Sequence, residues 1–322
     1  MAARRGLVLL ALVRCHAFLR SPSSPRALTV RHYLEEVVRG KLQEVEGLNA
    51  KHASGADSDV RSRLSFMAGR GNVRFSSAMR RVGDDGERLV SVVADVKRRS
   101  PHGGRDGGST VIAAFEDAGA VAAEVSRWPV DGLSVCADGR AYGGTLEDVS
   151  AARRAVAGLE AERPPICFKD FVVDPIQIAV AAELGADAVL LSATVLGGRL
   201  LDLLDTATVV GVECLVEVHT PNECQFALNA GATLLLCTNV DRTTGVYHEN
   251  QALGLKGFIP PNIVALAGGG VTDLNQARAL AAAGYDGVVL GRKLLEDPAS
   301  AEALVRQIRD IAVAPVDQLA WG

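Results

Sequence analysis

The sequence is poor in the features that mark nucleic-acid-binding and membrane proteins. Aromatic residues make up only 4% of the 322 residues, which argues against a surface on which bases stack. The formal charge is −4, so there is no broad basic surface for nucleic acid. No apolar run reaches the roughly 20 residues that span a bilayer. We therefore expect a protein that binds neither nucleic acid nor a membrane.

The chain also lacks the motifs of metal and dinucleotide sites. Its six cysteines form no CxxC pair and no Cys/His cluster at zinc spacing. Four of them lie in or beside apolar runs, at Cys136, Cys167, Cys214 and Cys237, where cysteine behaves as a small hydrophobic residue. Neither His102 nor His219 has a metal-ligating partner at suitable spacing, and no glycine fingerprint for a dinucleotide is present. We expect reduced cysteines, no metal and no cofactor.

Acidic residues are missing from the start of the chain. Residues 1–34 contain six arginines and no Asp or Glu, a composition typical of a targeting segment. Arg4 and Arg5 precede an apolar run at 6–13, and a small residue, Ala17, follows. This order resembles the two-part leaders of plastids that are bounded by extra membranes. A mitochondrial presequence is the alternative. We predict that 1–34 is an organelle-targeting leader.

The rest of the sequence is rich in short apolar runs that alternate with amphipathic segments. Strands are expected at 89–96, 132–137, 166–168, 188–192, 213–218, 233–237, 263–267 and 287–290. Helices are expected between most of them, among others at 175–184, 221–230, 273–283 and 301–311. An open doubly wound sheet and a (β/α)8 barrel both fit this order. Eight units in roughly 225 residues favour the barrel.

The pattern predicts an α/β protein with three parts. The leader at 1–34 is followed by an N-terminal helical extension at 35–88 and by a (β/α)8 TIM barrel at 89–322. Apolar residues at helical spacing predict a helix over 29–47, which would cover the floor or the edge of the barrel.

Charged residues stand where three of the expected strands end. Asp95 and Lys97 end the first strand and share a face, because side chains alternate along a strand. Lys169 ends the third strand and Glu217 the fifth. Active sites of such barrels lie at the carboxyl ends of the strands, and buried charges need partners or a use. The four residues predict an acid and a base that act on an anionic substrate.

Glycines follow the last two expected strands. Gly269 and Gly270 come after the seventh strand, and Gly291 comes after the eighth. Loops at these two strand ends form the recurrent phosphate site of the barrel, and Arg292 adds a guanidinium that can bind phosphate through two hydrogen bonds. The sequence therefore predicts a small phosphorylated substrate.

Six segments in order resemble the indole-3-glycerol phosphate synthase family of tryptophan biosynthesis, over about residues 30–312. They are KLQEV from Lys41, RFSSAMR from Arg74, ADVKRRSPHGG from Ala94, KDFVVDPIQI from Lys169, GADAVLL from Gly185 and LVEVH from Leu215. The resemblance implies a metal-free carbon-carbon lyase. This enzyme closes the ring of 1-(2-carboxyphenylamino)-1-deoxyribulose 5-phosphate, with loss of CO2 and water, and we also expect it to associate with other enzymes of the pathway.

The resemblance also implies roles for individual residues. Lys169 matches the general acid that protonates the substrate carbonyl, and Glu217 matches the catalytic carboxylate. Lys97 matches the lysine that holds the substrate carboxylate and assists proton transfer. Substrate and phosphate contacts are implied for Ser100, Phe171, Asn239, Gly270 and Gly291.

The chain departs from the family at several supporting positions. Asp95 stands for a glutamate and Asp241 for an arginine, while Arg242 comes one place later. The usual ESG is 268–270 (GGG), the usual serine after strand eight is Arg292, and the usual EKYF is 139–142 (GRAY). Two alternatives to the synthase follow from these losses. One is a catalytically inactive barrel that serves as a binding or structural subunit, and the other is a related lyase or isomerase with another phosphorylated substrate.

Overall fold

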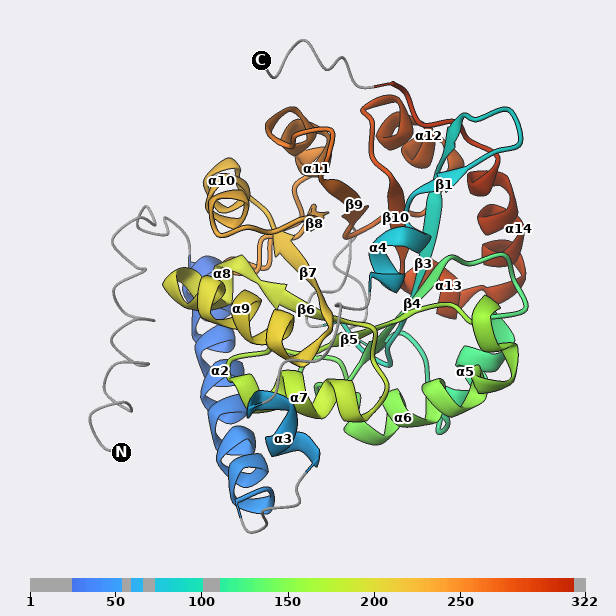
Figure 1. Cartoon of the computed structure of the whole chain (residues 1–322). Helices are drawn as coiled ribbons and strands as arrows, with labels where there is room; N and C mark the ends of the chain where they lie inside the picture. The colour runs from blue at the N-terminus through green and yellow to red at the C-terminus, as the bar shows by residue number, and fades with distance from the viewer. Residues whose placement is uncertain (1–24, 54–58, 66–72, 101–110, 316–322) are drawn as a thin grey trace.

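A computed structural model describes residues 25–53, 59–65, 73–100 and 111–315. Within these residues, eight parallel strands close into one barrel, in the order β10-β3-β4-β5-β6-β7-β8-β9 (Figure 1). The strands are β3 (Ser91–Val96), β4 (Gly132–Cys136), β5 (Ile166–Lys169), β6 (Ala188–Ser192), β7 (Glu213–Val218), β8 (Leu234–Thr238), β9 (Val264–Gly268) and β10 (Gly287–Leu290). The barrel expected from the alternating apolar runs is confirmed.

Helices connect the strands and cover the outside of the barrel (Figure 1). The longer ones are α5 (Ala118–Val125), α6 (Leu146–Ala155), α7 (Pro175–Glu183), α9 (Leu200–Val210), α10 (Pro221–Asn229), α12 (Leu274–Ala282) and α14 (Pro298–Arg309). Shorter ones are α8 (Ala193–Leu196), α11 (Gln251–Leu255) and α13 (Arg292–Glu296). Capping boxes at Thr145, Asp174 and Thr220 start α6, α7 and α10. These caps fix where the helices begin after the strand ends.

The core has two parts, which follow from the alternation of side chains along each strand. One set of residues packs between the strands and the outer helices. The other fills the barrel and includes Val93, Cys167, Leu190, Leu215 and Leu266. The five cysteines within the described residues are free thiols. Cys136, Cys167 and Cys237 are buried, as their apolar runs predict, whereas Cys214 is only partly buried and Cys224 is buried outside those runs.

The N-terminal extension closes one end of the barrel and covers one side. The short helix α4 (Arg74–Ala78) inserts Phe75 into the barrel interior. Glu213, at the first position of β7, accepts a hydrogen bond of 2.7 Å from the backbone N–H of Phe75, so α4 closes the amino end of the barrel. The helices α2 (Pro25–Lys51) and α3 (Asp59–Ser65) pack against α7. The carboxyl end of the barrel is not covered by α4, and the charged residues predicted for the site lie there.

Two boundaries differ from those expected. Helix α2 contains the helix expected at 29–47 and extends across the boundary placed at residue 34. The first barrel strand begins at Ser91 rather than 89, because Leu89 pairs with Arg81 in an antiparallel hairpin of β1 (Arg81–Val82) and β2 (Arg88–Leu89). The hairpin interrupts the apolar run before β3. None of the described helices is both long and apolar enough to cross a bilayer.

Candidate active site

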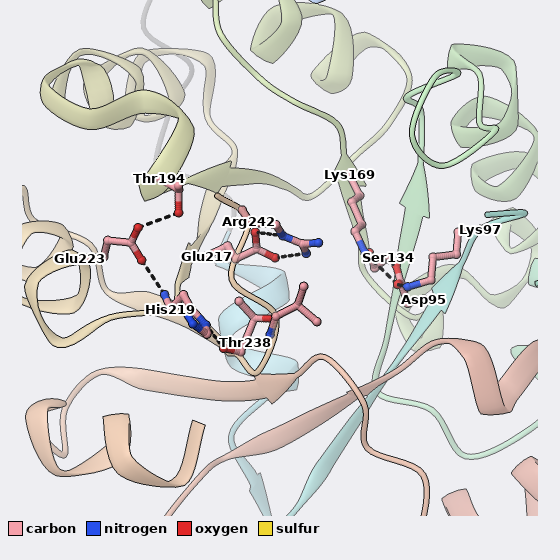
Figure 2. Close-up of polar contacts among 11 residues, drawn as sticks. Asp95, Lys97, Ser134, Lys169, Thr194, Glu217, His219, Glu223, Thr238 and Arg242 are labelled. Atoms are coloured by element: carbon pink, nitrogen blue, oxygen red, sulfur yellow. Dashed lines mark hydrogen bonds and ion pairs between the residues drawn. The ribbon is translucent and has the colours of Figure 1, made fainter. Parts of the chain in front are cut away.

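Asp95 holds two lysines at the carboxyl end of the barrel (Figure 2). Its carboxylate lies 2.6 Å from Lys97 Nζ and 2.8 Å from Lys169 Nζ. The hydroxyl of Ser134 on β4 is a further donor to Asp95, at 2.9 Å. Asp95 is 2% exposed, so its negative charge depends on these partners rather than on water. The predicted grouping of Asp95, Lys97 and Lys169 is present.

Burial and mutual attraction set the ionisation of this cluster. Burial alone would raise the pKa of Asp95, but Lys169 and Lys97 outweigh it and hold that pKa below its usual value. Burial opposes the charge of Lys169, and Asp95 more than compensates, so the pKa of Lys169 is raised. Burial lowers the pKa of Lys97. The cluster therefore keeps Asp95 ionised and Lys169 protonated at neutral pH.

Glu217 at the end of β7 pairs with Arg242. The guanidinium donates hydrogen bonds of 2.7 and 2.5 Å to the two carboxylate oxygens, the bidentate geometry that is strongest for this pair. Burial alone would raise the pKa of Glu217, but Arg242 outweighs it and lowers that pKa. Arg242 belongs to the segment between β8 and α11, where its displaced position in the sequence gave no reason to expect a contact with Glu217. The structure adds it to the site.

A cavity of about 670 Å³ joins these groups. Among the described residues, five cationic side chains line it: Lys97, Lys169, Arg242, Arg292 and Lys293. Three carboxylates of the same part of the chain also line it: Asp95, Glu217 and Glu296. The positive excess favours an anionic ligand, and the volume is that of a small-molecule site.

Glycines at the ends of β9 and β10 also line the cavity and form its glycine wall. Gly269 and Gly270 have φ angles of +78° and +108°, which favour glycine. A Cβ on Gly269 would lie 2.6 Å from the Thr238 hydroxyl, and one on Gly270 would lie 2.7 Å from the Tyr247 ring. A Cβ on Gly291 would lie 2.9 Å from Lys97 Nζ. Because glycine has no side chain, the backbone at these positions can lie close to Thr238, Tyr247 and Lys97.

Of the other predicted contact residues, two line the cavity and two do not. Ser100 and Arg292 line it, and Arg292 also pairs with Glu296 at 2.8 Å. Phe171 instead stacks on Tyr142 with ring centroids 5.9 Å apart, and Asn239 accepts a hydrogen bond from the backbone of α11. Neither of these two is among the described residues that line the cavity, and their contact with the substrate stays a prediction.

Tyr142 occupies the wall in front of Phe171. Its ring lies 5.0 Å from Lys169 Nζ, within range of a cation–π contact. Burial raises the pKa of Tyr142 to about 12, so the phenol remains neutral at physiological pH. The residue stood out in the sequence only as a departure from EKYF, which gave no sign that it touches the lysine.

A buried lysine of the N-terminal extension supports the part of the site that carries Asp95, Lys97 and Lys169, here called the lysine side. Lys41 Nζ on α2 lies 2.8 Å from Asp170 and 3.0 Å from Asp138. Asp170 follows Lys169, and Asp138 follows β4. Burial, only partly offset by Lys41, raises the pKa of Asp170 to about 6. Helix α2 is thereby tied to the loops behind Lys169 and Tyr142.

The closed parallel barrel, with acidic and basic groups around a cavity at the carboxyl ends of its strands, defines a (β/α)8-barrel enzyme. The model of the family described as "Indole-3-glycerol phosphate synthase" matches residues 34–308. The chain belongs to this family.

Individual relatives agree with the family match. The indole-3-glycerol phosphate synthase of Mycobacterium ulcerans is 35% identical over 221 residues, which cover 66% of this chain and 75% of the relative. That of Thermoanaerobacter pseudethanolicus is 28% identical over 267 residues, covering 82% of this chain and 94% of the relative.

Solved structures of other enzymes share the fold alone. 3-Hexulose-6-phosphate synthase from Salmonella typhimurium has a TM-score of 0.52 at 13% identity, covering 68% of this chain and 98% of its own. Thiamine phosphate pyrophosphorylase from Pyrococcus furiosus has a TM-score of 0.50 at 16% identity, covering 69% of this chain and 96% of its own.

Proposed function

We propose that this chain is an active indole-3-glycerol phosphate synthase. Its reaction joins the aryl carbon that carries the carboxylate to the ketone carbon of 1-(2-carboxyphenylamino)-1-deoxyribulose 5-phosphate. CO2 and water are then lost. The observation that carries the proposal is the position of Lys169 and Lys97 on one carboxylate, in the same cavity as Glu217. This arrangement supplies an acid, a site for an anionic group and a base.

Lys169 is the group that protonates the substrate carbonyl in this scheme. Its protonated form is stabilised by Asp95, and proton donation to the carbonyl oxygen makes the ketone carbon a better electrophile. Lys97 shares Asp95 but lies in the cavity wall with a lowered pKa caused by burial. An incoming substrate carboxylate would stabilise the charge of Lys97 and become positioned for ring closure.

Glu217 is the group that accepts the proton released during dehydration. Arg242 keeps this buried carboxylate ionised, so it enters the reaction in the basic form. The paired guanidinium also fixes the carboxylate in one orientation. Arg242 thus supplies a positive charge near the position at which Asp241 replaces the arginine usual in the family.

The phosphate would bind at the glycine wall. Gly269, Gly270 and Gly291 line the cavity there with Arg292, and backbone N–H groups at these two loops form the recurrent phosphate site of the fold. Arg292 lies at the start of α13 and supplies charge where the family uses serine. Its partner Glu296 lies in the same wall, so the guanidinium would divide its hydrogen bonds between Glu296 and the phosphate.

The test uses the full chain with 1-(2-carboxyphenylamino)-1-deoxyribulose 5-phosphate and follows indole fluorescence. Turnover that Lys169→Ala and Glu217→Gln both abolish supports the synthase. A folded protein that binds this substrate without turnover supports a changed reaction with a related substrate. A folded protein that neither binds nor converts it contradicts the proposal and supports the binding or structural subunit.

We propose that residues 1–34 direct the chain to a plastid, with the mitochondrion as the alternative. The six arginines and the lack of acidic residues support this proposal. Residues 1–24 lie outside the described residues. Fusion of 1–34 to a fluorescent protein tests the proposal: plastid signal supports it, mitochondrial signal supports the alternative, and diffuse signal contradicts both.

We also propose that the chain associates with other enzymes of tryptophan biosynthesis. The support is the family membership alone, since consecutive enzymes of a pathway share intermediates. Co-purification of the tagged chain with another enzyme of this pathway from the cells that make it supports the association. Recovery of the tagged chain without any of them contradicts it.

A further inference from the structure

Three side chains of metal-ligating type meet beside the active site. His219 follows β7, and Asp241 and His248 lie between β8 and α11. One ligand atom from each residue lies within 4.8 Å of the other two. The rings of His219 and His248 have centroids 5.3 Å apart. The proposed reaction uses none of the three, and their wide separation in the sequence conceals the cluster.

His219 is held in the tautomer that a metal requires. Its Nδ1 lies 2.8 Å from the backbone carbonyl oxygen of Thr238 (Figure 2). A carbonyl oxygen can only accept a hydrogen bond, so Nδ1 carries the proton and Nε2 has the free lone pair. Metal-ligating histidines commonly use this bond to a carbonyl to fix the ring. The backbone N–H of His219 also donates to Glu223, at 2.7 Å.

Asp241 is fixed by its own turn. One carboxylate oxygen accepts a hydrogen bond of 2.7 Å from the backbone of Thr243, and the other accepts one of 2.7 Å from the Thr244 hydroxyl. The first oxygen also accepts a hydrogen bond of 3.3 Å from the backbone N–H of Thr244, so the second oxygen is the one with a lone pair left for a metal ion. The ring of His248 is exposed, while its backbone N–H is anchored to the carbonyl oxygen of Asn239 at 2.8 Å. Two ligands are therefore held in place, and the third is able to rotate.

We propose that His219, Asp241 and His248 bind a divalent transition metal ion of the Zn²⁺ type. Two imidazoles and a carboxylate suit zinc and its neighbours, whereas Ca²⁺ and Mg²⁺ prefer oxygen ligands alone. Ligands about 2.0–2.2 Å from zinc in a tetrahedral site lie roughly 3.5 Å apart. Ligand atoms up to 4.8 Å apart must therefore approach one another by about 1 Å. This requires rotation of the exposed His248 side chain together with small shifts of the His219 and Asp241 side chains. Water completes the coordination.

The ion would join two loops that carry active-site groups. Glu217 lies two positions before His219, and Arg242 directly follows Asp241. A bond network through the ion would hold the segment after β8 against the end of β7, where Arg242 meets Glu217. The metal would thus act as a structural link outside the cavity. Its binding does not depend on which reaction the cavity performs.

The test is titration of the full chain with Co²⁺, a spectroscopic substitute for Zn²⁺, followed by competition with Zn²⁺. We expect one equivalent to give visible absorption bands of a low-coordinate site, which Zn²⁺ removes. His248→Ala and Asp241→Asn should each weaken Co²⁺ binding by at least about 100-fold. The exposed position of His248 and the acceptor oxygen of Asn make both changes compatible with folding, and circular dichroism checks this.

His52→Ala is the matched control, because His52 lies beyond the end of α2 and should leave the titration unchanged. Equal Co²⁺ binding by the parent chain, His248→Ala and Asp241→Asn would overturn the proposal, as would the absence of any bands. Neither result bears on turnover, so a failure here is distinguishable from a failure of the synthase assignment.

Discussion

The two charged sides of the cavity are built in different ways. On the lysine side, Asp95 and Lys169 stand on barrel strands and Lys97 directly follows one. On the carboxylate side, Glu217 stands on a strand, but its partner Arg242 comes from the segment between β8 and α11. Strand ends are fixed by the hydrogen-bond ladder of the barrel, whereas a loop can shift by a residue. The lysine side is the more rigidly specified of the two.

The supports behind the two sides differ as well. Helix α2 supports the lysine side through Lys41, which contacts Asp170 and Asp138. On the carboxylate side, Arg242 binds Glu217 from the segment between β8 and α11. The sequence position of a charged loop residue can therefore change between relatives while its charge still reaches the same place in the site. This accounts for an arginine that is displaced in the sequence and still reaches the catalytic carboxylate.

The largest expected effect is on the lysine side. Lys169→Met should lower kcat by about 10³-fold, since it removes the general acid but keeps the length of the side chain. Lys97→Met, the matched variant on the same carboxylate, should mainly raise KM because Lys97 binds the substrate carboxylate. Steady-state kinetics with indole fluorescence measures both. Equal losses of kcat in the two variants would contradict the division of roles.

The next largest effect is expected on the stability of the fold, at Lys41 behind the lysine side. Lys41→Met leaves two buried carboxylates without their cation, which should lower the free energy of unfolding by roughly 3 kcal/mol. Urea denaturation measures this change. Lys51→Met, at the exposed end of the same helix, should change it by less than about 0.5 kcal/mol. A similar loss in both variants would show that the effect belongs to α2 in general.

The destabilisation by Lys41→Met should depend on pH. The pKa of Asp170 is already raised to about 6 by burial, with Lys41 opposing, so removal of Lys41 raises it further. A carboxyl group whose pKa is higher in the folded state than in the unfolded state binds a proton more readily when folded. The deficit relative to the parent chain should therefore be smaller at pH 5 than at pH 8. The opposite trend would contradict the assignment of Lys41 as partner of Asp170.

The barrel and the lysine side were predictable from the sequence for a physical reason. Buried parallel strands appear as apolar runs, and alternation then places Asp95 and Lys97 on one face. The start of β3 was missed because Leu89 is apolar like a barrel residue but pairs in the hairpin with Arg81. The apolar character of a residue does not show whether it pairs in the hairpin or in the barrel.

The carboxylate side was only half predictable. Glu217 follows from its strand, but the contacts of Arg242, Tyr142 and His248 depend on how irregular segments fold back. The resemblance implies substrate contacts for Phe171 and Asn239. In the structure the Tyr142 ring stacks on Phe171, and the backbone N–H of Ala252 in α11 donates to Asn239. No periodicity fixes such positions, so local spacing carried little information about them.

Arg242→Ala tests the loop-borne partner. We expect kcat/KM to fall roughly 100-fold, because a fixed charge beside the catalytic carboxylate is lost. Arg242 lowers the pKa of Glu217 against the effect of burial, so its removal raises that pKa. The ionised form of Glu217 is then lost at a higher pH, and the acid limb of the kcat/KM profile should move upward.

Arg242→Lys is the control for Arg242→Ala. It keeps a positive charge but loses the bidentate geometry, so the acid limb should move less and kcat/KM should fall less. A pH profile that is the same in the parent chain and in Arg242→Ala would show that Arg242 does not govern the ionisation of Glu217. The carboxylate side would then resemble the lysine side, with its properties set by the strand alone.

The smallest effect is expected at Tyr142, which faces Lys169 from the loop after β4. Burial raises the pKa of its phenol to about 12, so the hydroxyl stays protonated and does not act as a base at neutral pH. The ring contacts Lys169 and Phe171, and each contact is worth about 1 kcal/mol. Tyr142→Phe keeps both contacts and should change kcat/KM by less than about threefold, as a few tenths of a kcal/mol allow.

Tyr142→Leu removes the ring and should lower kcat/KM by roughly fivefold, the equivalent of about 1 kcal/mol. The difference between the two variants isolates the ring from the hydroxyl in the same kinetic assay. If kcat/KM fell as much in Tyr142→Phe as in Tyr142→Leu, the contribution of Tyr142 would come from its hydroxyl. The lysine side would then depend on a loop-borne polar atom, just as Glu217 depends on Arg242, and the contrast between the two sides would disappear.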